Sequence, residues 1–120
     1  MKTILIVEDV DLNIDLLRQI LEDDYHLLVA RDGAEGVALS DQHQPDLVLM
    51  DISLPVMDGY EATRRIRAKF PALPVIGLSA NAMQSDADRA LAAGCNDYLT
   101  KPVDDRLLLE KLDKFLGHND

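Results

Sequence analysis

Five side chains with useful chemistry directly follow short strand-like segments of this sequence. Glu8 and Asp9 follow the first segment, Asp51 the third, Ser79 the fourth and Lys101 the fifth. Three crowded carboxylates repel one another unless a cation joins them. A small number of oxygen ligands, completed by water, suits Mg²⁺. With a fixed ammonium and a hydroxyl added, the set can position a phosphoryl group and neutralise its charge during transfer to a carboxylate.

The segments that carry these side chains alternate with helical patterns along the chain. Short, mostly apolar runs predict strands over residues 4–7, 26–30, 47–50 and 75–78, and a mixed run predicts a fifth strand over 98–100. Apolar residues at helical spacing predict helices over residues 11–22, 34–42, 59–69 and 83–93. A last helix, rich in leucine, follows a cap at Asp104 and ends before Gly117.

This alternation predicts an α/β fold with five parallel strands and helices on both faces of the sheet. Right-handed crossovers favour the doubly wound, flavodoxin-like strand order 2-1-3-4-5. The first and third strands are neighbours in that order, so Glu8, Asp9 and Asp51 should converge at the carboxyl edge of the sheet. The 120 residues fit one domain, which we expect to span residues 1–120 with no separate output domain.

Composition narrows the class of protein further. The formal net charge of −10 argues against direct binding of nucleic acid, which requires clustered basic residues. The excess acid is equally compatible with simple solubility and with a site that binds a cation. No apolar run reaches transmembrane length, so we expect no membrane insertion. The single cysteine, Cys95, cannot form an intramolecular disulfide and fits a reducing cytoplasm, where it should pack as a small apolar residue.

Each candidate also has an ordinary structural interpretation. Asp9 could be the N-cap of the first helix, and Asp51 could cap a turn at the end of its strand. Ser79 could be a loop hydroxyl bonded to the backbone, and Lys101 a surface lysine. Taken singly, each residue type is more often structural than functional. Their common position at one predicted sheet edge favours a shared site.

Four sequence segments, found in this order, resemble the receiver domains of bacterial response regulators. They run from Ile4 to Asp9, from Pro45 to Gly59, from Leu78 to Ala80 and from Asp97 to Pro102. The resemblance implies a phosphorylation-dependent switch of two-component signalling rather than an enzyme with a separate substrate. It also implies that Asp51 accepts the phosphoryl group from a phosphohistidine on a histidine kinase or histidine phosphotransfer protein.

The resemblance also implies a Mg²⁺ site around the acceptor. Asp9 and Asp51 would bind the ion directly, Glu8 would help through water, and the backbone carbonyl of Ser53 would supply a further ligand. Residue 10 is valine, where many members of the family carry a third polar residue. The two essential acids of this loop are nevertheless present.

Further roles follow from the same resemblance. Lys101 would pair with the acceptor carboxylate and then with the phosphoryl oxygens, and Ser79 would hydrogen-bond the phosphoryl group. Tyr98 would change rotamer when Ser79 moves, and Pro102 would follow a cis peptide bond. The signal would then pass to a downstream protein target through the surface formed by the fourth helix, the fifth strand and the last helix.

Two other classes of protein fit this sequence less well. A haloacid-dehalogenase-like phosphatase generally needs an aspartate two residues after its nucleophile, and Ser53 stands there. A flavodoxin-like interaction module that works without phosphorylation, a pseudo-receiver, is the main alternative. The complete set of acids, serine and lysine disfavours it.

Overall fold

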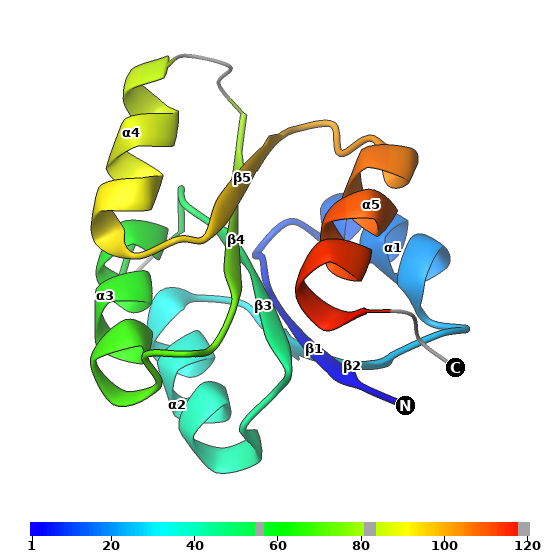
Figure 1. The fold of residues 1–120 in the computed structure, drawn as a ribbon, viewed down its shortest axis with the longest axis horizontal. Helices are drawn as coiled ribbons and strands as arrows, with labels where there is room; N and C mark the ends of the chain where they lie inside the picture. The colour runs from blue at the N-terminus through cyan, green and yellow to red at the C-terminus, as the bar shows by residue number, and fades with distance from the viewer. Residues whose placement is uncertain (55–56, 81–83, 118–120) are drawn as a thin grey trace.

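The computed structural model describes residues 1–54, 57–80 and 84–117. Strands and helices alternate along this part of the chain (Figure 1): β1 (Thr3–Val7), α1 (Asp11–Leu21), β2 (His26–Ala30), α2 (Gly33–His43), β3 (Leu47–Asp51), α3 (Gly59–Lys69), β4 (Val75–Ser79), α4 (Gln84–Ala93), β5 (Asp97–Thr100) and α5 (Asp105–Leu116). The predicted alternation is confirmed, with boundaries shifted by a residue at several ends. The predicted start of the fourth helix at Met83 lies outside the described residues.

The strands form one parallel sheet in the order β2-β1-β3-β4-β5, which confirms the predicted topology. Helices α2, α3 and α4 cover one face of the sheet, and α1 and α5 cover the other (Figure 1). No helix in the described ranges combines the length and the apolar character that crossing a membrane requires.

Side-chain alternation along the central strands builds a core on each face of the sheet. Leu5 and Val48 pack in the cluster beneath α2, α3 and α4, whereas Ile4 and Leu47 pack in the cluster beneath α1 and α5. All of these side chains are fully buried. Successive residues of a strand point to opposite faces, so a strand covered on both sides must be apolar throughout. The two cores hold β1 and β3 side by side, which positions the residues that follow them.

Three of the helices begin at an aspartate that caps the first turn. The carboxylates of Asp32, Asp58 and Asp104 accept hydrogen bonds from backbone N–H groups three residues further on, at 2.8, 2.9 and 3.1 Å. Helix α1 differs, because its N-cap is Val10, which makes no side-chain capping hydrogen bond. The interpretation of Asp9 as a helix cap is therefore wrong, and its exposed carboxylate is available for other ligands.

Candidate functional site

The predicted convergence of acids occurs at the carboxyl ends of β1 and β3. Val7 pairs with Met50, so the next residues of the two strands lie side by side. One carboxylate oxygen from each of Glu8, Asp9 and Asp51 lies within 4.8 Å of the other two. Glu8 and Asp51 are buried, whereas Asp9 is exposed. The site is therefore a cluster of two buried carboxylates with one solvent-exposed carboxylate beside them.

Glu8 is a fully buried carboxylate whose two oxygens both have close polar partners. Its Oε2 accepts hydrogen bonds from the backbone N–H groups of Asp9 at 3.0 Å and Val10 at 3.2 Å. Its Oε1 lies 2.7 Å from Nζ of Lys101. Burial by itself raises the pKa of Glu8, but the contacts from Lys101 and Val10 outweigh it and hold this pKa below its ordinary value. Glu8 is therefore ionised in the folded protein.

Asp51 is 3% exposed and lies at the last position of β3. Its Oδ1 accepts a hydrogen bond from the Ser53 N–H at 3.0 Å, and its Oδ2 lies 3.1 Å from Nζ of Lys101. Burial is the largest influence and, with the negative charge of Glu8, raises the pKa of Asp51 from 3.8 to about 6. The Ser53 N–H and the Lys101 ammonium oppose this rise. Asp51 does bond to the turn after its strand, but its burial and its lysine partner exceed what a turn cap needs.

Lys101 bridges the two buried carboxylates. Its side chain is only 17% exposed, so the interpretation of Lys101 as a surface lysine is wrong. Burial acts to lower the pKa of Lys101, but the two carboxylates prevail and raise it above its ordinary value. Its backbone N–H donates to the Ser79 carbonyl at 2.6 Å. The peptide bond between Lys101 and Pro102 is cis, the geometry that the family resemblance implied.

The remaining predicted residues lie around this cluster at different depths. Ser79 is the last residue of β4 and is 3% exposed, so a buried hydroxyl does lie on the strand next to Asp51. Ser53 is exposed in the loop after β3. Tyr98 lies on β5 and is partly buried against the core cluster beneath α2, α3 and α4. The structure thus groups Glu8, Asp9, Asp51 and Lys101 directly.

Gly59 is a supporting residue that the sequence analysis missed. It begins α3, and its N–H donates to the Ile52 carbonyl at 3.2 Å. A Cβ atom at this position would lie 2.3 Å from the Asp51 carbonyl oxygen and 2.4 Å from the Ile52 Cα. Both atoms belong to the backbone, so relief requires the end of β3 or the start of α3 to move. The available sequence signal was the glycine directly after the capping Asp58.

We expect the Gly59→Ala substitution to lower the free energy of unfolding by about 2 kcal/mol, because it overpacks backbone against backbone. Gly77→Ala is the matched control, since its Cβ would meet no atom closer than the Cys95 Sγ at 3.4 Å. Urea unfolding of both variants measures the difference. Equal stability of the two variants would contradict the close approach of α3 to Asp51.

The residues of the cluster fit a hard divalent cation. Every candidate donor atom is an oxygen, and three carboxylates share one small volume. Within the described part of the chain, Glu8 Oε1 is buried with no well-formed hydrogen bond, and only the ion-pair contact with Lys101 balances it. A cation near these oxygens would relieve the repulsion between Glu8 and Asp51.

Similarity of the sequence to known proteins shows which family of domains carries this site. The sequence matches the response regulator receiver domain over residues 4–113. The chain belongs to the response-regulator receiver family. Among the relatives of this receiver is the polar-differentiation response regulator DivK of Brucella anthropi. The two are 37% identical over 119 residues, which cover 97% of both proteins.

Solved structures of other receivers share this fold. The receiver domain of a Pseudomonas aeruginosa sensor histidine kinase, which has a magnesium ion coordinated in its active-site cleft, is 39% identical with a TM-score of 0.89 and 98% coverage of both chains. The receiver domain of Ssk1 from Saccharomyces cerevisiae was crystallised with the histidine phosphotransfer protein Ypd1. It is 32% identical with a TM-score of 0.89, covering 95% of this receiver and 88% of that chain.

Proposed function

We propose that this receiver accepts a phosphoryl group on Asp51 from the phosphohistidine of a histidine kinase or a histidine phosphotransfer protein. The observation that carries the proposal is the buried Asp51 carboxylate, which contacts the Lys101 ammonium at 3.1 Å beside two further carboxylates. An oxygen of Asp51 attacks the phosphorus, the bond from phosphorus to the histidine nitrogen breaks, and an acyl phosphate forms. With a pKa of about 6, Asp51 is mostly in the ionised, nucleophilic form at neutral pH.

The proposed reaction depends on Mg²⁺. Asp9, Asp51 and the backbone carbonyl of Ser53 would hold the ion, with Glu8 acting through water. The ion supplies charge neutralisation for the phosphoryl oxygens. The fit of the oxygen-only donor set and the magnesium ion in the Pseudomonas aeruginosa receiver support this assignment.

Lys101 and Ser79 would receive the transferred group. The Lys101 ammonium already contacts Asp51 Oδ2, and it can pass to the new phosphoryl oxygens with little movement. The Ser79 hydroxyl, on the neighbouring strand, would donate to another oxygen. Phosphorylation adds charge and acceptor oxygens that draw both groups inward. This movement would change the packing of Tyr98 and the surface formed by α4, β5 and α5, where a downstream protein target binds.

The structures of related receivers and the net charge of this protein both indicate what kind of partner it binds. The Ssk1 receiver forms a complex with a histidine phosphotransfer protein, which supports a phosphotransfer partner for this chain. The net charge of −10 favours a protein target over direct contact with nucleic acid. The single cysteine suits the reducing cytoplasm, where we place this exchange.

Intact-protein mass spectrometry after incubation with acetyl phosphate tests the proposal. We expect one phosphoryl adduct that requires Mg²⁺, is absent in Asp51→Asn and persists in the control Asp58→Asn. Asp58 is exposed in the same loop, and asparagine preserves its capping role for α3. Absence of an adduct on the wild type, or an adduct retained by Asp51→Asn, would favour the pseudo-receiver alternative or another acceptor.

A further inference from the structure

Arg67, on α3, donates hydrogen bonds to a loop that lies far from the phosphoryl site. Its Nη1 contacts the carbonyl oxygens of Phe70 at 3.3 Å, Pro71 at 2.9 Å and Leu73 at 2.6 Å. These three carbonyls belong to the connection between α3 and β4. Burial lowers the pKa of Arg67, yet arginine keeps its charge at any ordinary pH. One guanidinium therefore holds this loop in a single conformation.

The other side of the same guanidinium holds the turn between α4 and β5. Nε and Nη2 of Arg67 donate to the Gly94 carbonyl at 3.1 and 2.7 Å, and Nη2 also donates to Asn96 Oδ1 at 2.6 Å. Gly94 has a φ of 113°, a conformation that favours glycine. A Cβ atom on Gly94 would lie 3.2 Å from the Arg67 Cγ. The turn between α4 and β5 thus packs directly against the Arg67 side chain.

Asn96 extends this contact into the sheet. Its Oδ1 also accepts from the Val75 N–H at 2.9 Å, and its own N–H donates to the Val75 carbonyl at 2.7 Å. Val75 is the first residue of β4, and Asn96 directly precedes β5. The starts of the two strands are therefore joined at the point that Arg67 holds. We call Arg67, Gly94, Asn96 and Val75 the Arg67 latch.

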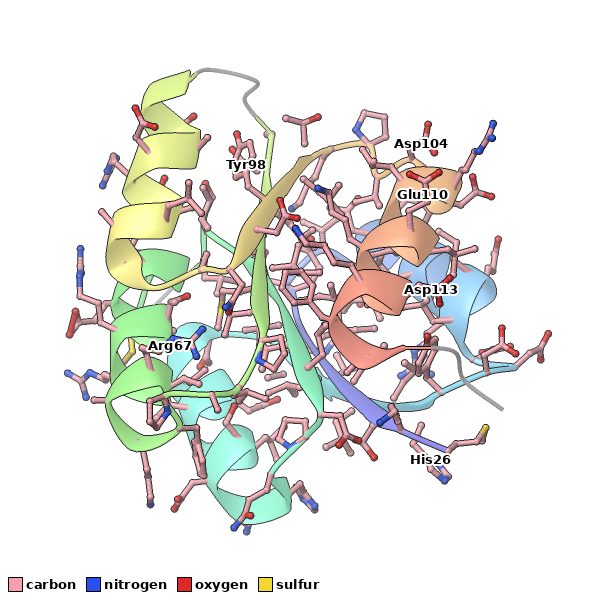
Figure 2. The ribbon with its side chains drawn as sticks, in the orientation of Figure 1. His26, Arg67, Tyr98, Asp104, Glu110 and Asp113 are labelled. Carbon is pink, nitrogen blue, oxygen red and sulfur yellow. The ribbon has the colours of Figure 1, made fainter. Side chains whose placement is uncertain are left out.

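The latch matters because β5 is an edge strand of four residues, Asp97–Thr100, paired with β4. A short edge strand has few hydrogen bonds of its own to specify its register. The far end of the pair is held at the phosphoryl site, where Lys101 N–H donates to the Ser79 carbonyl. Tyr98 lies between these two fixed ends. Figure 2 labels Arg67 on α3 and Tyr98 on β5, and Tyr98 pairs with Gly77 in the middle of β4, two residues along the chain from Asn96.

We propose that Arg67 is a positioning residue for the switch. The latch fixes the carboxyl end of α4 and the start of β5. A change at Ser79 and Lys101 therefore moves the Tyr98 side chain, because the turn between α4 and β5 cannot shift to accommodate it. This role rests on the proposed function only where it concerns phosphorylation. Lysine cannot replace the arginine, because an ammonium has no planar fork to reach the loop, the turn and Asn96 together.

Amide hydrogen exchange of the unphosphorylated protein tests the latch itself. In Arg67→Met we expect the Asn96 amide to exchange about tenfold faster, with little change at central amides such as Ile6, because a local opening is favoured. Arg67→Lys should show the same pattern. The control Arg64→Met removes an exposed arginine of the same helix that pairs with Glu61 at 3.2 Å, and it should leave exchange unchanged. No acceleration, equal acceleration throughout the sheet, or the same effect in Arg64→Met would overturn the proposal.

Asn96→Ala provides a second variant in case Arg67→Met fails to fold. Asn96 is exposed, and its loss removes only the Oδ1 acceptor of the latch. We expect the backbone amides of the turn at Gly94 and Cys95, which bond to Leu91 and Ala90 carbonyls, to exchange faster in this variant. Unchanged exchange at both amides would show that Asn96 does not hold the turn, and would overturn the latch.

The coupling to the switch is tested separately with acetyl phosphate and Mg²⁺. We expect Arg67→Met to form the Asp51 adduct at a rate within about twofold of wild type, because the latch lies at the opposite end of the strands. The change in the Tyr98 ring NMR signals on phosphorylation should be lost or strongly reduced. A normal Tyr98 response would overturn the positioning role. Absence of any adduct on the wild type would count against the proposed function and leave the exchange result intact.

Discussion

Substitution of Lys101 by methionine is expected to destabilise the metal-free protein by about 3 kcal/mol at pH 8, the cost of leaving buried charges without their partner. Its ammonium lies 2.7 Å from Glu8 Oε1 and 3.1 Å from Asp51 Oδ2. Methionine fills a similar volume but cannot balance the two carboxylates. Urea unfolding in the presence of a chelator measures the effect. The loss should shrink toward pH 5, as protonation of the carboxyl groups replaces the missing cation.

Lys111→Met is a closely matched control for this prediction. Lys111 pairs with Asp97 at 2.9 Å, and its side chain is 21% exposed, against 17% for Lys101. That pair leaves no buried carboxylate when it is broken, so we expect a loss of about 1 kcal/mol or less. The double variant Glu8→Gln/Lys101→Met should be more stable than Lys101→Met alone. Equal losses for the two lysines would refute the role of Lys101 as the internal counter-ion.

The Asp51→Asn substitution is expected to change stability in the opposite direction and to raise the free energy of unfolding of the metal-free protein at pH 8. Folding raises the pKa of Asp51 from 3.8 to about 6. The folded state therefore binds this proton more tightly, and the contribution of Asp51 to stability is complete below about pH 4 and is lost as the pH rises through about 6. The rise in pKa corresponds to about 3 kcal/mol. The variant should match wild type near pH 4 and exceed it by up to this amount above pH 6.

Magnesium should reduce this difference in stability. Mg²⁺ binds a site that needs the Asp51 carboxylate, so it should raise the melting temperature of wild type more than that of Asp51→Asn. Asp58→Asn again serves as control, and its stability should follow wild type at every pH. A metal-free Asp51→Asn variant less stable than wild type at pH 8 would mean that the contact of Asp51 with Lys101 outweighs its burial and its repulsion from Glu8.

Prediction from the sequence was most successful where local patterns repeat. Continuous apolar runs such as residues 47–50 are typical of strands covered on both faces, and the structure buries all of β3. The strand order then followed from general rules of handedness, and it placed Glu8 and Asp51 together before any contact was known. The capping aspartate Asp104 likewise predicted the start of α5 correctly.

Prediction was incomplete where a side chain had two plausible partners. The sequence left a helix cap open as an alternative role for Asp9, and only the structure showed that α1 has Val10 as its N-cap and that Asp9 joins the acid cluster. The pairing of Lys101 with Glu8 as well as with Asp51 was not anticipated, because the resemblance pointed only to the acceptor. Arg67 looked like one of several cations near the end of α3, and nothing in its neighbours distinguished it from Arg64.

The sequence by itself determined the α/β architecture, the edge of the sheet that carries the site and the family of the chain. These depend on periodicity and on residue types, which are properties of segments read one at a time. Only the tertiary structure decided that Lys101 neutralises two buried acids, that Gly59 lies against the backbone of Asp51, and that Arg67 joins two loops. Such contacts connect residues far apart in the chain, and packing of the whole domain selects among the partners that each side chain could reach.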